Sequence, residues 1–168
     1  MRRSHFDNAV ARVTRGALAG LAATVVLRAL RRSMQHRVPE GTPPMRAEPG
    51  PEMVERLEGA LPEEMQERIP PRAEAAAART LAFGYGATLA VLYALARPRG
   101  GDILRDGIVL GFGAWGIAYL GWLPALGMSP SVARMKPLQV AVPVLQHTVY
   151  GLAATGAYEG LRRVQRRM

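Results

Sequence analysis

The chain contains no cysteine, which excludes disulfide bonds, thiolate metal sites and cysteine nucleophiles. Histidine is scarce as well, since His5, His36 and His147 are too far apart in sequence for the usual spacing of metal ligands. The chain also lacks a Walker loop and the short motifs of zinc peptidases and serine hydrolases. We therefore expect no enzyme activity, no metal and no cofactor.

Charge is missing from three long segments, residues 80–96, 107–133 and 137–158, although the chain carries 22 basic and 13 acidic residues. The mean hydropathy of +0.01 conceals this blocky distribution. A charged side chain at the centre of a bilayer costs about 2.5–3.5 kcal/mol, and a spanning helix needs about 20 mostly apolar residues. A soluble helical protein would instead place charge along every helix with a period of about 3.6 residues. The pattern predicts a small polytopic membrane protein.

A fourth apolar segment, residues 16–27, is shorter and ends at Arg28. Its length also suits a cleaved signal peptide, but no small-residue cleavage site follows Arg28. We favour an uncleaved first helix over residues 10–30, in which Arg28 extends toward the lipid headgroups.

The predicted fold is all-α, a bundle of four transmembrane helices in a single domain, residues 1–168. We expect the helices at approximately residues 10–30, 73–96, 102–123 and 137–160. Asp102 is suited to cap the third helix, because a short acidic side chain can accept from the first backbone N–H groups. Pro124 is expected to end or kink that helix, and Pro143 to kink the fourth.

A polar, proline-rich loop, residues 31–72, is expected between the first two helices. Residues 38–51 should be extended, because proline disfavours the helical conformation in the residue before it. Residues 52–69 should form one or two short helices, with Pro62 at the start of the second. Their narrow apolar stripe fits a helix on the membrane surface or across the end of the bundle, and a solvated acidic helix fits it equally well.

Small residues recur at helix-packing spacings in the apolar segments. Where a β-carbon is absent, helix backbones approach closely, and van der Waals contact can hold them together in lipid. This predicts a packed bundle within one chain, and contacts in a homo-oligomer are also open. The alternative explanation is that glycine is simply common in membrane helices. The predicted packing residues are Gly16, Gly20, Gly86, Gly107, Gly111 and Gly151.

Four spans would place both termini on the same side of the membrane. The basic residues divide evenly, with 11 on the terminal side and 11 on the other, but nine glutamates lie between residues 40 and 74. The dense arginine at the C-terminus favours cytoplasmic termini in the bacterial inner membrane. The net charge of +9 fits contact with anionic lipid headgroups better than nucleic acid, since no basic helix face is present.

Polar residues inside the apolar segments are few, and most lie on the predicted fourth helix. A shared face with a titratable histidine would suit a proton relay or a substrate contact, although ordinary hydrogen bonds between helices would also explain it. The members of this face, at spacings of three and four, are Gln139, Gln146, His147 and Tyr150. The candidate charged residues are Arg28 and Arg79, which could reach headgroups or loop acids, and Glu159, which could pair with an arginine in the C-terminal turn.

Several features follow one another in a recognisable order. They are a Gly/Ala-rich first helix (16–27), a proline-rich loop (38–51), a Gly/Trp-rich third helix (107–122), the sequence Leu-Gly-Met-Ser-Pro (126–130), and a fourth helix with a mid-membrane histidine and a C-terminal arginine cluster. In this order the chain resembles the YagU-like family of small bacterial inner-membrane proteins of uncharacterised function, although its first loop is more acidic. The resemblance implies an architecture and supplies no catalytic residues.

These observations predict a non-enzymatic membrane protein with an accessory role, related to the envelope or to stress. The alternative is a small oligomeric transporter or channel that uses the polar face of the fourth helix. A water-filled lumen reaching His147 would favour the channel. A buried His147 that is hydrogen-bonded between helices would favour the accessory protein.

Overall fold

The computed structural model describes residues 2–35, 49–97 and 101–167, and all regular secondary structure in these ranges is helical. The prediction of an all-α fold is confirmed for this part of the chain. The long segments are α1 (Arg2–Gln35), α4 (Pro71–Ala96), a composite of α5 (Ile103–Gly116), η1 (Ile117–Trp122) and α6 (Leu123–Ala125), and α7 (Pro137–Gln165). The short ones are α2 (Pro49–Glu58), α3 (Glu63–Gln66) and the 3-10 turn η2 (Val132–Arg134).

Three of these segments are long and apolar enough to cross a membrane, namely Ala9–Met34, Pro71–Ala96 and Ile103–Ala125. The prediction of membrane-spanning helices is therefore supported for three of the four segments. α7 has 29 residues but does not reach the same apolarity, because Gln146, His147 and Thr148 interrupt it. It packs instead against both α1 and α5, so much of its polar surface lies inside the protein.

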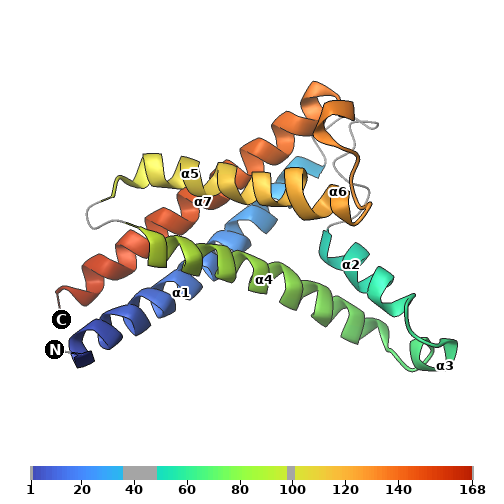
Figure 1. The fold of residues 1–168 in the computed structure, drawn as a ribbon, viewed down its shortest axis with the longest axis horizontal. Helices are drawn as coiled ribbons and strands as arrows, with labels where there is room; N and C mark the ends of the chain where they lie inside the picture. Colours follow the sequence, from blue (N-terminus) through green and yellow to red (C-terminus); the bar gives the residue numbers. More distant parts are fainter. Residues whose placement is uncertain (1, 36–48, 98–100, 168) are drawn as a thin grey trace.

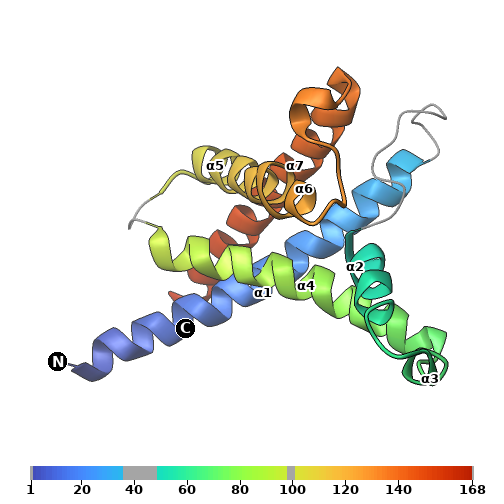
Figure 2. The ribbon, with the colours of Figure 1, turned by 45° about the vertical axis from the view of Figure 1, so that its right-hand side comes forward.

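The long helices form two antiparallel pairs, α1 with α4 and α5 with α7, and contact between α1 and α7 joins the pairs (Figures 1 and 2). The start of α1 and the end of α7 lie toward the same end of the molecule. The end of α4 lies near the start of α5, and the two helices diverge from there in the shape of a V (Figure 1). α2 lies near the wide end of this V.

Glycine permits the close approach of α1 and α4. A β-carbon on Gly20 would lie 2.5 Å from the carbonyl oxygen of Gly86 and 2.7 Å from the Cα of Ala87, and one on Gly16 would lie 2.9 Å from the Cα of Val91. These neighbours are backbone atoms, so they could not turn aside as a flexible side chain could. A β-carbon on Gly86 would meet the hydroxyl of Thr24.

α5 and α7 also approach each other closely at glycines. A β-carbon on Gly111 would lie 2.6 Å from the carbonyl oxygen of His147, and one on Gly107 would lie 2.9 Å from the Cα of Leu152. Gly151 faces both α5 glycines, and its β-carbon would lie 2.6 Å from the backbone nitrogen of Gly111. All six glycines named from the sequence thus lie at helix–helix contacts.

The ends of the third segment differ partly from expectation. Asp102 caps α5 as predicted, since its carboxylate accepts from the backbone N–H of Arg105 at 2.7 Å. The helical path does not end at Pro124 but continues to Ala125, and the non-helical residue is Gly121, inside the π-helical turn η1 (φ −109°, ψ −107°). Pro124 is tolerated because it stands in the first turn of α6, where its missing N–H has no helical partner to lose.

The first loop also differs. Most of the segment predicted to be extended, residues 38–48, lies outside the described residues, but residues 49–51 form the first turn of α2. Proline is well tolerated there because its fixed φ suits the start of a helix. The sequence predicts one or two short helices here, and the described residues form two, α2 and α3; Pro62 stands immediately before α3 rather than as its first residue.

Candidate functional site

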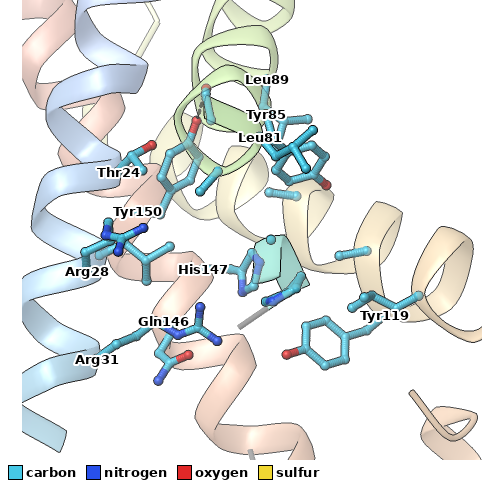
Figure 3. Close-up of a pocket in the computed structure, with 18 of the residues that line it drawn as sticks. Thr24, Arg28, Arg31, Leu81, Tyr85, Leu89, Tyr119, Gln146, His147 and Tyr150 are labelled. Carbon is cyan, nitrogen blue, oxygen red and sulfur yellow. Dashed lines mark hydrogen bonds between the residues drawn. The ribbon is translucent and has the colours of Figure 1, made fainter. Parts of the chain in front are cut away.

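A cavity of about 350 Å³ lies among the helices, where α4 and the α5–α6 segment diverge (Figure 3). This volume is near the lower limit for small-molecule sites, roughly 300–1,000 Å³. All four long segments and α2 contribute to its wall, and none of the described residues that line it is acidic. Its apolar wall includes Leu27, Met53, Leu81, Ala82, Leu89, Ala114, Ala118 and Leu123.

The polar side chains of the cavity gather toward one side. Figure 3 shows Arg28, Arg31 and Gln146 on that side, Tyr85 and Tyr119 on the opposite side, and His147 between the two groups. Gln146 is only 6% exposed, yet its side-chain amide makes no hydrogen bond in the part of the chain that the structure describes. Arg28 also packs on an aromatic ring, with its guanidinium carbon 5.9 Å from the ring centre of Phe83.

His147 has a defined tautomer in this setting. Its Nδ1 lies 2.8 Å from the carbonyl oxygen of Pro143, one turn earlier in the same helix. A carbonyl oxygen can only accept, so Nδ1 carries the proton, and in the neutral ring Nε2 is left as an acceptor. The half-buried ring packs edge-on against Tyr119, with centroids 5.8 Å apart. Within residues 2–35, 49–97 and 101–167 no hydrogen bond links His147 to another helix, and the ring borders a largely apolar cavity rather than a polar lumen.

The predicted polar face divides into two parts. Tyr150, 3% exposed, lines the cavity with Gln146 and His147 and donates its hydroxyl to the carbonyl of Gly86 at 2.5 Å, which ties α7 to α4. Gln139 is not part of the cavity wall. Its side chain accepts from the backbone N–H of Lys136 at 2.8 Å and so caps the start of α7.

Two aromatic side chains of the wall have buried polar atoms without partners. Tyr85 and Trp122 meet edge-to-face with their ring centres 5.9 Å apart. Neither the hydroxyl of Tyr85 nor the indole N–H of Trp122 has a hydrogen-bond partner within the described ranges. Such groups are costly in a low-dielectric interior, so this wall is less fully satisfied than the helix contacts around it.

α2 forms the cover of the cavity on its open side. Met53 lines the cavity and packs against the cluster of Ala118, Tyr119 and Leu123. Arg56 donates to the carbonyl oxygens of Leu126 at 2.6 Å and Gly127 at 3.2 Å, just past the end of α6, where helix carbonyls lack partners within the helix. α2 is thus attached to the third segment as well as to α4.

A second group of polar residues lies at the opposite end of the protein. Arg97, 8% exposed, forms ion pairs with Asp106 (2.9 Å) and Glu159 (3.0 Å) and donates to the carbonyl of Gly101 at 2.5 Å. The rings of Tyr93 and Tyr158 lie 5.8 Å and 5.7 Å from its guanidinium carbon. Burial opposes its charge, but the hydrogen bonds to the two carboxylates outweigh this and raise the pKa of Arg97 above its ordinary value.

The other charged residues named from the sequence occupy different settings. Glu159 is 5% exposed and pairs with Arg162 at 2.5 Å in the C-terminal turn as well as with Arg97. Arg79 is exposed on α4. Arg12 on α1, which was not singled out from the sequence, donates to the carbonyl of Ala94 and so caps the end of α4. None of the charged residues of this end lines the cavity, so the structure holds two separate polar regions.

Sequence reasoning missed Arg97 and Asp106. Both stand directly beside charge-free segments, at the ends of apolar helices that meet on the same side of the protein. That position was the available signal, because a charge at the end of a buried helix needs a partner from a neighbouring helix.

Within the described ranges, no group of three or more histidine, aspartate or glutamate side chains could hold a metal ion. No family model matches the chain, and comparison with curated proteins and with solved structures likewise finds no match.

Proposed function

We propose that the chain crosses the bacterial cytoplasmic membrane four times, with α7 as the fourth span and both termini in the cytoplasm. Two observations support this. α7 runs antiparallel to α1 and α5 over most of its length, and it ends toward the end of the molecule where α1 begins (Figure 1). Its polar residues face protein rather than lipid, and a helix enclosed in this way can be less apolar than its neighbours.

The absence of native cysteine allows a direct test of this topology with single cysteine substitutions. In intact cells, a membrane-impermeant maleimide should label Ser131→Cys and Ala60→Cys, which stand in exposed turns at the proposed periplasmic end. Arg166→Cys, exposed after α7, should react only after permeabilisation. Labelling of Arg166→Cys together with Ser131→Cys in intact cells would leave α7 outside the membrane and overturn the four-span arrangement.

We further propose that the protein is not an enzyme but an accessory protein of the envelope that binds a membrane amphiphile in its cavity. The observation that carries this proposal is the cavity itself, an apolar space with a polar side, bordered by the spans Ala9–Met34, Pro71–Ala96 and Ile103–Ala125. An amphiphile from the surrounding bilayer would match both parts of that wall. The same proposal includes contact between the C-terminal arginines and anionic lipid headgroups. It also includes membership of the YagU-like family.

Filling the cavity should displace this amphiphile. We expect the purified wild-type protein to retain one class of amphiphile at near-stoichiometric amounts, measured by mass spectrometry of the extracted lipids. Ala82→Phe would place a ring in the cavity and should remove that amphiphile, whereas Ala76→Phe, at an exposed site outside the cavity on the same helix, should not. If both variants retained it equally, the cavity would not be its binding site.

A small transporter remains the second candidate, because His147 borders the cavity instead of being bonded to another helix. The two roles differ in what purified protein does in vesicles. An accessory protein binds its amphiphile without accelerating its movement between leaflets, while a transporter accelerates that movement and loses the acceleration in His147→Phe.

A further inference from the structure

We infer that the cavity takes a single-chain amphiphile with a carboxylate headgroup, a long-chain fatty acid, bound with the headgroup beside Arg31 and Gln146. The inference rests on the proposed function, which gives the cavity an amphiphilic ligand, and it names the chemical class of that ligand.

Charge is the first argument. Arg31 projects from α1 into the polar side of the cavity, and the described residues give it no ion pair or hydrogen bond. Among the residues that the structure describes, the cavity wall contains no acidic side chain that could balance it. A guanidinium in a partly desolvated, apolar setting attracts an anion more strongly than it would in water.

The side-chain amide of Gln146 is a second donor without a partner among the described residues. This side chain is more than nine-tenths buried, lines the cavity and lies on the same side as Arg31 (Figure 3). Its amide is not among the fully enclosed unsatisfied atoms, so it reaches the space of the cavity, where a ligand oxygen can accept from the amide N–H₂. Arg31 and Gln146 together offer donors to the two oxygens of one carboxylate.

The tautomer of His147 indicates which part of the cavity the carboxylate headgroup would occupy. Because Nδ1–H donates to the carbonyl of Pro143, Nε2 is an acceptor in the neutral ring and repels a carboxylate oxygen. The headgroup therefore lies at Arg31 and Gln146, and the chain runs past His147 toward Leu81 and Tyr85 on the opposite side of the cavity (Figure 3).

Volume and headgroup size select the class of ligand. A cavity of about 350 Å³ is small for a two-chain phospholipid, which would have to leave a chain outside. A carboxylate and a phosphodiester each present two charged oxygens, and the N–H donors of a guanidinium and an amide can satisfy either, so donor number does not separate them. The carboxylate is the smaller headgroup, and on a single chain it leaves more of the cavity for the chain.

The two tryptophans give a direct measurement. Trp122 lines the cavity and Trp115 does not, so Trp115→Phe leaves a single reporter inside the cavity, and Trp122→Phe leaves one outside it. Brominated stearate quenches tryptophan fluorescence on contact. It is titrated into the protein in detergent at mildly alkaline pH, where the carboxyl group is ionised. Brominated methyl stearate and a brominated single-chain phosphatidylglycerol serve as the uncharged and phosphate probes.

We expect saturable quenching of Trp122 by the carboxylate, binding about tenfold or more tighter than the methyl ester, and no saturable quenching of Trp115. Arg31→Gln should lower the affinity for the carboxylate about tenfold and leave that for the ester unchanged. Arg32→Gln, at the neighbouring exposed arginine that does not line the cavity, is the matched control and should bind as the parent does.

The outcomes separate the two proposals. Equal binding of carboxylate and ester, or no effect of Arg31→Gln, overturns the anionic ligand but leaves an amphiphile-binding cavity in place. Tighter binding of the phosphate probe overturns the carboxylate assignment. If no probe quenches Trp122 saturably, the proposed function fails together with the inference.

Discussion

Gly151→Ala is expected to lower the free energy of unfolding substantially, although it adds only one methyl group. The new β-carbon would overlap the carbonyl oxygen of Gly107 and lie 2.6 Å from the nitrogen and 2.9 Å from the Cα of Gly111. All three are backbone atoms of α5, so the clash is relieved only if α5 and α7 move apart. Overpacking of this kind typically costs about 1–3 kcal/mol. The measurement is reversible unfolding in mixed detergent micelles, followed by tryptophan fluorescence.

Gly156→Ala provides the control on the same helix. A β-carbon there has no neighbour within 4 Å, so alanine adds helix propensity without a clash and should be neutral or stabilising by up to about 1 kcal/mol. The two substitutions make the same chemical change, and their difference isolates the contact between helices. Equal stabilities of the two variants would show that close packing of α5 and α7 does not hold the bundle together.

Arg97→Ala should be the most damaging substitution at the end of the protein away from the cavity. It would leave Asp106 and Glu159 without the guanidinium that both carboxylates share. Removing one partner from a buried ion pair typically costs about 3–5 kcal/mol, because the remaining charge stays buried. Arg97→Lys should fall between wild type and Arg97→Ala, since an ammonium group lacks the planar fork that reaches both acids at once. Unfolding in the same micelles measures both variants.

Two comparisons make this expectation specific. Arg105→Ala removes an exposed arginine near the same end and should change stability by less than about 0.5 kcal/mol. The triple variant Arg97→Met, Asp106→Asn, Glu159→Gln removes all three charges, and it should recover much of the loss, because no buried charge is then left unpaired. If Arg97→Ala were as stable as Arg105→Ala, the ion pairs would contribute nothing to the fold.

The helices could be predicted from the sequence because lipid imposes a simple rule on composition. Charge-free segments and boundary residues such as Asp102 located the helices well, and the glycine spacings identified the surfaces in contact. The end of the third helix was harder. Pro124 is a strong signal for a break, but the irregular residue is Gly121, since the chain bends where the residue has least steric restriction.

The polar residues were less predictable, because their roles depend on which helices are neighbours. Periodicity put Gln139 on one face with His147, but it could not show that Gln139 stands in the first turn and satisfies the backbone there. Helical periodicity likewise gave no hint that α4 and α5 diverge and leave a cavity between them. Arg97 and Asp106 come from different helices, and their pairing follows from tertiary arrangement alone.

The division of the bundle into two antiparallel pairs has a consequence for biogenesis. Each pair is a helical hairpin of consecutive long helices with its own glycine contact, so the first can leave the translocon as a unit while the second is still being synthesised. In the proposed four-span arrangement α7, the least apolar of the long helices, would emerge last, when α5 already offers it a glycine-lined surface. Synthesis order would then supply a protein environment for the helix that lipid alone would accept least readily.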